Sequence, residues 1–224
     1  MKKVNYIAAG ISALTLAGMM LPVGQVFAAD QTKTSVAEIN LKGGELTLDA
    51  VPDLNFGEIP LADILAGNVT KALKDNTVPV GPIKTTTDPK DGNATGDLSV
   101  TDLRGSNAGW ELTAQLGALK NSANQTLAGT MTLQGANLIT DNPSYDLTNN
   151  PKEPKTLTFG ETTSVTIWRA AATDGTATNM GQGQGKNTVK ISDTNTSLAL
   201  TQNPTATAGQ YQAAITWTLS DAPK

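Results

Sequence analysis

Short runs rich in Thr, Val, Ile and Leu, separated by clusters of Gly, Asn, Asp and Pro, recur along most of this 224-residue chain. Runs of this length bounded by turn-forming residues are typical of β-strands, and few segments show the period of an amphipathic helix. Their number favours an all-β fold, an immunoglobulin-like β-sandwich. The predicted strands are 38–41, 45–50, 98–103, 110–116, 130–133, 164–169, 188–191, 198–201 and 211–219.

One short helix is expected from Leu61 to Lys74, where five apolar residues recur at helical spacing after Pro60. Gly67 and the β-branched residues Val69 and Thr70 weaken that prediction, because each has a low helix propensity. Loops or flexible turns are predicted at 80–96, 141–155 and 181–185, the last with the sequence GQGQG.

The first 28 residues have the features of a secretory signal peptide. Lys2 and Lys3 precede an uncharged apolar stretch, and Val26-Phe27-Ala28 fits the small-residue pattern before a cleavage site. The expected organisation is a signal peptide at 1–28 and one domain at 29–224. Without the two leader lysines the net charge changes from −4 to −6, so the exported chain carries no basic footprint for nucleic acid.

The chain contains no cysteine, so we expect a fold stabilised by core burial without disulfides or a lipidated cysteine. The C-terminal sequence TWTLSDAPK contains neither an apolar span nor a wall-sorting tail. Any attachment to a surface is therefore expected to be non-covalent, with no membrane contact after cleavage.

The absence of His as well as Cys removes the usual nucleophilic triads and the usual zinc and copper ligands. The acidic residues are scattered, and no carboxylate pair is marked by an apolar setting that would suit glycoside hydrolysis. We expect no enzymatic activity, no cofactor and no catalytic residues.

The segment from Asp91 to Asp102 nearly matches a calcium-binding loop, with oxygen side chains at several of the required positions and Gly96 at the sixth. Thr95 and the terminal Asp102 are weaker ligands than the pattern requires, and the flanks are not helical. We favour a turn that enters a strand and expect no metal site.

Two W-x-L motifs are the strongest local signals. Trp110-Glu111-Leu112 lies in GWELTAQL, and Trp217-Thr218-Leu219 lies in YQAAITWTLSDAP near the C-terminus. Alternate residues of a strand face the same side, so the Trp and Leu of each motif share one face of a half-buried strand.

With these two motifs in this order, DLRGSNAGWELTA around the first and the terminal TWTLSDAP, the chain resembles the small WxL-domain surface proteins of low-GC Gram-positive bacteria. The resemblance covers nearly the whole chain after residue 28. It implies non-covalent binding to peptidoglycan at the cell wall, and association with the WxL-interacting surface proteins that accompany the family.

Alternation by itself predicts that Trp110 and Trp217 pack in the core, in which case the motif marks the fold more than the contact surface. Trp168 shares its parity with Ser164 and Thr166, so it is the better candidate for an exposed aromatic ring. The candidate binding residues are Trp110, Leu112, Trp168, Trp217 and Leu219. The main alternative function is a secreted adhesive or structural subunit that binds host or partner proteins.

Overall fold

The computed structural model describes residues 30–87, 90–140, 149–175, 181–191 and 194–221. The predicted signal peptide and its cleavage site lie outside these residues, as does most of the predicted loop at 141–155. The contacts divide the chain into one unit that ends at Asn40 and a second that begins at Leu41. In the first unit, residues 30–40 are exposed and form no helix or strand.

A five-stranded sheet forms one layer of the second unit, with strand order β3-β1-β4-β12-β9. Its pairings are antiparallel except for the short parallel contact between β1 and β3. The strands are β1 (Leu46–Pro52), β3 (Gly92–Asn93), β4 (Asp97–Asp102), β9 (Gly135–Thr140) and β12 (Gly185–Ile191).

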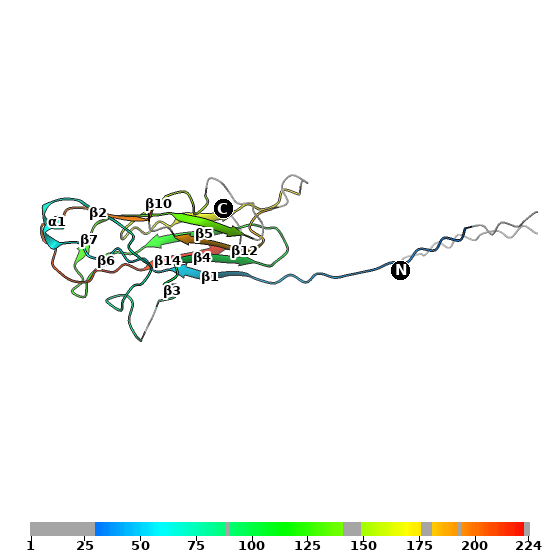
Figure 1. Ribbon diagram of the computed structural model, residues 1–224, viewed down its shortest axis with the longest axis horizontal. Helices are drawn as coiled ribbons and strands as arrows, with labels where there is room; N and C mark the ends of the chain where they lie inside the picture. Colours follow the sequence, from blue (N-terminus) through cyan, green and yellow to red (C-terminus); the bar gives the residue numbers. More distant parts are fainter. Residues whose placement is uncertain (1–29, 88–89, 141–148, 176–180, 192–193, 222–224) are drawn as a thin grey trace, which may run out of the picture. The chain divides into compact units, whose positions relative to one another are not determined.

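A three-stranded antiparallel sheet has β5 at its centre, between β11 and β14. Its strands are β5 (Trp110–Leu116), β11 (Val165–Ala170) and β14 (Ile215–Ser220). Burial alternates along β5 without interruption, as its alternating sequence predicts. Figure 1 shows β5 and β14 lying along roughly the same axis as β1, β4 and β12, with paired neighbours pointing in opposite directions.

A four-stranded sheet, ordered β10-β8-β13-β2, and a two-strand ribbon complete the architecture. The sheet contains β2 (Val69–Ala72), β8 (Gly129–Leu133), β10 (Lys155–Thr158) and β13 (Ser197–Leu200). The ribbon pairs β6 (Leu119–Lys120) with β7 (Thr126–Leu127), and the one helix of the described residues is α1 (Leu61–Ala66).

The main core lies where the sheets face one another, with buried residues from each of them. Leu98 and Val189 come from the five-stranded sheet, Leu112 from the three-stranded sheet, and Met131 and Leu157 from the four-stranded sheet. The prediction of an all-β sandwich with one short helix is therefore confirmed.

A second apolar cluster lies at the end of the domain where Figure 1 labels α1, β2, β6 and β7. It joins Ile64 of α1, Leu119 of β6 and Leu127 of β7 to Leu198 and Leu200 of β13. This cluster gives the short helix its buried face, since Ile64 is the buried residue of α1.

The helix prediction was wrong beyond Ala66. The backbone is extended at Gly67, and the residues that follow form β2, where Val69 lies opposite Leu200 and Thr70 opposite Ala199 of β13. β-branched side chains pack well on a pleated sheet, so pairing with β13 overrides the helical spacing of the apolar residues.

The strand predicted at 38–41 was also wrong, because these residues pair with no strand and Ile39 and Leu41 are 82% and 90% exposed. The strand predicted at 211–219 begins only at Ile215. Sequence analysis missed six strands, β2, β3, β6, β7, β9 and β10, of which three contain only two residues. No helix in the described part of the chain is long and apolar enough to cross a membrane.

Candidate functional site

All three tryptophans lie on the three-stranded sheet, one on each strand. The register places Leu112 of β5 directly opposite Trp168 of β11 on one side and Leu219 of β14 on the other. Residues directly opposite one another in a sheet project to the same face, so these three side chains form one row across the sheet. The fold therefore brings the two W-x-L motifs together on adjacent strands.

Trp110 is fully buried, as sequence alternation predicted. Its ring packs edge-on against Trp168, with ring centroids 5.2 Å apart and an interplanar angle of 73°. The indole Nε1 donates a hydrogen bond of 3.2 Å to the carbonyl oxygen of Gly183. Buried indole N–H groups usually find a hydrogen-bond partner, and the GQGQG turn supplies one for Trp110.

The backbone conformation and the close contacts at position 183 favour glycine over any other residue. The φ of Gly183 is +74°, and a Cβ built on it would lie 2.5 Å from both Trp110 Nε1 and Ala170 Cβ. The same carbonyl also accepts a hydrogen bond from Asn187 Nδ2 at 2.7 Å. The turn predicted at 181–185 is thus fixed by specific contacts to the first motif.

The expectation that Trp168 is an exposed aromatic ring was wrong, since its side chain is 1% exposed. The register of β11 against β5 shifts between Thr166 and Trp168, so Ile167 is an extra residue in the strand. A β-bulge of this kind reverses the alternation beyond it. Ile167 and Trp168 are both buried as a result, although they are adjacent in sequence.

Trp217 is only partly buried, in contrast to Trp110, and so is Leu219. The core prediction for Trp217 therefore holds only in part. Because β5 and β14 are antiparallel, the two motifs meet at their leucines while Trp217 lies opposite Ala114, four residues along β5 from Trp110. Four residues of a strand span about 14 Å, so Trp217 lies about that far from Trp110 along the strand direction, on the same face of the sheet.

Trp217 lines a cleft of about 1360 Å³ that runs between β1, β14 and the loops around them and reaches the second apolar cluster, whose Ile64 and Leu200 also line it. Six aromatic residues fall within the described part of the chain, and two of them, Trp110 and Trp168, are in the core. The other four all line this cleft and are partly buried: Phe56, Phe159, Tyr211 and Trp217. Concentration of the accessible aromatic rings in one cleft makes it the candidate binding site of the domain.

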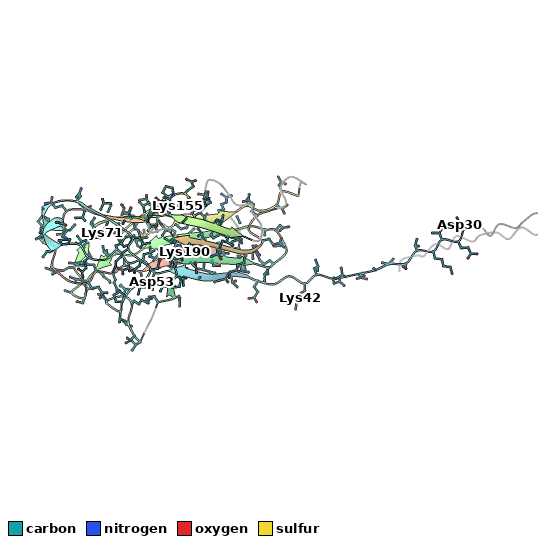
Figure 2. The ribbon with its side chains drawn as sticks, viewed as in Figure 1. Asp30, Lys42, Asp53, Lys71, Lys155 and Lys190 are labelled. Atoms are coloured by element: carbon teal, nitrogen blue, oxygen red, sulfur yellow. The ribbon has the colours of Figure 1, made fainter. Side chains whose placement is uncertain are left out.

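Hydrogen bonds hold one wall of the cleft in place. The buried side chain of Gln212 accepts bonds from the backbone N–H groups of Ile83 and Lys84, at 2.8 and 3.2 Å, and donates to the carbonyl of Pro79. The side chain of Lys84 in turn forms an ion pair with Asp53. Asp53, which Figure 2 labels, is the residue that follows β1. The loop at 79–84 is thereby fixed against the segment that carries Tyr211.

A second network fixes the loop that carries Phe56. Asn55 Nδ2 donates to Asp75 Oδ1 at 2.9 Å and to the carbonyl of Thr77 at 3.0 Å, and Asn55 Oδ1 accepts from the N–H of Gly57 at 2.9 Å. The backbone hydrogen bond from Thr77 and the side-chain bond from Asn55 hold the pKa of Asp75 below its ordinary value of 3.8. Hydrogen bonds within the chain therefore hold both of these loops, which form two walls of the cleft, in place.

Arg104 connects the strands that carry the motifs. Its guanidinium donates to both carboxylate oxygens of Asp102, at 2.9 and 2.8 Å, and to the carbonyls of Gly109, just before Trp110, and Asp221, just after β14. Burial of Asp102 would raise its pKa, but the side-chain and backbone hydrogen bonds from Arg104 and its positive charge outweigh burial and lower it.

The segment from Asp91 to Asp102 forms the short β3, a turn and then β4, so the turn that enters a strand is as favoured from the sequence. Asn93 Oδ1 accepts from the backbone N–H of Thr95 and of Asp97, and its Nδ2 donates to two carbonyls, so the amide organises the turn. Asp102 lies in β4 against Arg104. No group of three or more acidic side chains suited to a metal ion occurs in the described residues.

The arrangement is suited to binding. Three of the five predicted binding residues, Trp110, Leu112 and Trp168, are buried and build the fold, and only Trp217 of the five reaches the cleft. Sequence analysis did not single out Phe56, Phe159 or Tyr211 as site residues. The sequence signal that could have identified them is the low aromatic content, since the chain contains only three Phe and three Tyr.

Comparison with known proteins gives one match. The model of the WxL domain, described as surface cell wall-binding, matches residues 22–223. No curated protein matches, and no solved structure matches.

Proposed function

Because the chain belongs to the WxL family of surface cell wall-binding domains, we propose that it binds the peptidoglycan of a Gram-positive cell wall without a covalent link. In this proposal residues 1–28 are removed on export, and residues 29–224 form the wall-binding domain. The observation that carries the proposal is the family match, which spans residues 22–223.

In this proposal the residues of the two motifs have two different roles, core packing and contact with the ligand. Trp110, Leu112 and Trp168 supply core packing, and Leu219 extends the same row on β14. Trp217 lies two residues before Leu219 on β14, in the wall of the cleft that Phe56, Phe159 and Tyr211 also line, the aromatic cleft. We propose that contact with the wall is made from the cleft side and that the protein acts by binding alone, since the chain has no His or Cys for nucleophilic catalysis.

Co-sedimentation with purified sacculi tests this function. The protein is expected to sediment with peptidoglycan stripped of teichoic acids, and heat-unfolded protein provides the control for non-specific adsorption. A folded protein that stays in the supernatant at all concentrations of sacculi contradicts wall binding and favours the alternative of a secreted adhesive or structural subunit.

We also propose that the protein belongs to a surface complex with WxL-interacting surface proteins. β9 supports this, because it is the last strand of the five-stranded sheet and pairs in the described residues with β12 only. It also carries Ile139, which is 71% exposed. An edge strand offers unpaired backbone groups to a partner's strand. Crosslinking on intact cells tests the complex, and recovery of wall fragments without any protein adduct contradicts it.

A further inference from the structure

We propose that the aromatic cleft is the wall-binding site and that its ligand is the sugar strand of peptidoglycan, a neutral chain of N-acetylated sugars. This inference rests on the proposed function and names the ligand of that function. It assigns Phe56, Phe159, Tyr211 and Trp217 as the residues that contact sugar rings.

The chemistry of the lining favours a sugar ligand. A sugar ring presents an apolar C–H face, which packs on the flat face of an aromatic side chain, and polar edges, which hydrogen-bond to the rim. The four rings come from four separate segments of the chain around one cleft. Small-molecule pockets occupy roughly 300–1000 Å³, so a cleft of about 1360 Å³ accommodates several sugar units of a strand.

The charge of the cleft favours the neutral sugar strand over the anionic polymers of a Gram-positive wall as its ligand. Its lining contains four carboxylates, at Asp49, Asp53, Glu58 and Asp91, and three ammonium groups, at Lys74, Lys84 and Lys90. Asp53 and Lys84 neutralise each other in an ion pair. Because the charges nearly balance, the cleft does not attract anionic teichoic acids. A neutral sugar strand can bind there without charge attraction.

A peptide strand is the alternative occupant, because β14 lines the cleft and pairs in the described residues with β5 only, which leaves its outer edge for a further strand. Part of the nearby backbone is already paired, since β3 covers the edge of β1 at Val51 and Pro52, and the N–H and C=O of Gln212 pair with Lys120. We favour the sugar strand because rings from four separate segments line one cleft, and binding of a peptide-free sugar oligomer decides between the two occupants.

Trp217 provides a direct readout. The chain contains three tryptophans, and Trp110 and Trp168 are 0% and 1% exposed, so a ligand in the cleft changes the fluorescence of Trp217. Titration with a β-1,4-linked hexamer of N-acetylglucosamine is expected to shift that emission in a saturable way. Removal of the stem peptides by an amidase dissolves sacculi into soluble glycan strands, and these strands are expected to shift the same emission when about 0.15 M salt screens the lactyl carboxylates that the cut exposes.

Variants that replace a ring by an aliphatic side chain separate ring contact from packing. Tyr211→Leu and Phe56→Leu are each expected to weaken hexamer and sacculus binding about tenfold, the effect of losing one well-packed aromatic contact. Thr218→Ala is the matched control, because Thr218 is exposed and lies next to Trp217 on the opposite face of β14. Melting temperatures of all variants are measured, and only variants that fold as the wild type are compared.

The outcomes distinguish the inference from the proposed function. Wild-type protein that binds intact sacculi but neither the hexamer nor the released glycan strands would retain wall binding and overturn the sugar ligand. Folded ring variants that sediment as wild type, or that lose only a crosslinked protein partner, would overturn the cleft as the wall site. A protein that binds the hexamer but not sacculi contradicts the proposed function while supporting the cleft.

Discussion

Leu219 lies directly opposite Leu112 on the neighbouring antiparallel strand, so the two W-x-L motifs meet at their last residues and diverge toward their tryptophans. The pairing explains why one motif sequence produces two environments. Trp110 lies in the closed core beside Trp168, and Trp217 lies at the open cleft. The predictions below follow from this arrangement.

Trp110→Ala is expected to destabilise the domain more than Trp217→Ala. Truncation of a fully buried aromatic residue costs about 3–5 kcal/mol, and Trp110 also loses its contact with Trp168 and its bond to Gly183. Trp217 is partly solvated, so its truncation costs less. Urea unfolding of both variants measures the difference. Equal losses of unfolding free energy would contradict the separate environments of the two motifs.

Gly183→Ala is expected to destabilise the fold through both backbone and side-chain strain. A residue with a Cβ in the left-handed region costs about 1–2 kcal/mol, and the clash with Trp110 and Ala170 adds about 1–3 kcal/mol. Gly105→Ala is the matched control, because Gly105 has a similar φ of +69° with nothing within 4 Å of its Cβ position. Thermal melts compare the two variants. Similar melting temperatures would mean that the Trp110 pocket tolerates the methyl group.

Arg104→Ala is expected to cost about 3–5 kcal/mol, because it leaves the nearly buried Asp102 carboxylate unpaired. Arg104→Lys retains the charge but loses the planar fork that reaches both Asp102 oxygens and the carbonyl of Gly109, so it is expected to recover only part of the loss. A double-mutant cycle with Asp102→Asn measures the coupling. Additive effects of the two substitutions would show that the pair contributes no coupling energy.

Acid is expected to destabilise the protein as the pH falls below about 4, because Asp102 and Asp75 both have lowered pKa values in the folded state. The unfolded carboxyls bind protons near the ordinary value of 3.8, and the folded ones only at lower pH. The stability contributed by these carboxylates is present above the unfolded pKa and is lost as the pH falls through the folded pKa. Urea unfolding measured from about pH 2 to about pH 7, a range that brackets the ordinary aspartate pKa, gives the slope of stability against pH. Asp102→Asn is expected to flatten the slope of unfolding free energy against pH. An unchanged slope would show that Asp102 does not contribute to the acid destabilisation.

Binding to sacculi is expected to change little with moderate salt. The chain carries a net charge of −4, or −6 without its first 28 residues, so charge attraction to an anionic wall does not drive the association. At about 0.15 M salt the screening length is about 8 Å, which reduces repulsion between like charges. Co-sedimentation over a salt series measures this. Loss of binding at that ionic strength would indicate a local basic patch.

The sequence by itself determined the all-β class and most of the longer strands, because alternation and turn residues are local signals. It determined in the same way that Trp110 and Leu112 face the core, since the alternation along β5 is unbroken. The surface, wall-binding character of the family was implied by the resemblance of the motifs and is supported by the family match, whereas export stays a prediction from residues 1–28.

Only the tertiary structure decided the features that depend on pairing between distant segments. The bulge at Ile167 turned Trp168 inward, and pairing with β13 converted residues 69–72 from a predicted helix to a strand. The antiparallel register of β5 and β14 placed Trp217 at the cleft, beside Phe56, Phe159 and Tyr211 from three other segments. Neither a bulge nor a cleft leaves a periodic trace in the chain, because each arises from contacts between residues that are far apart in sequence.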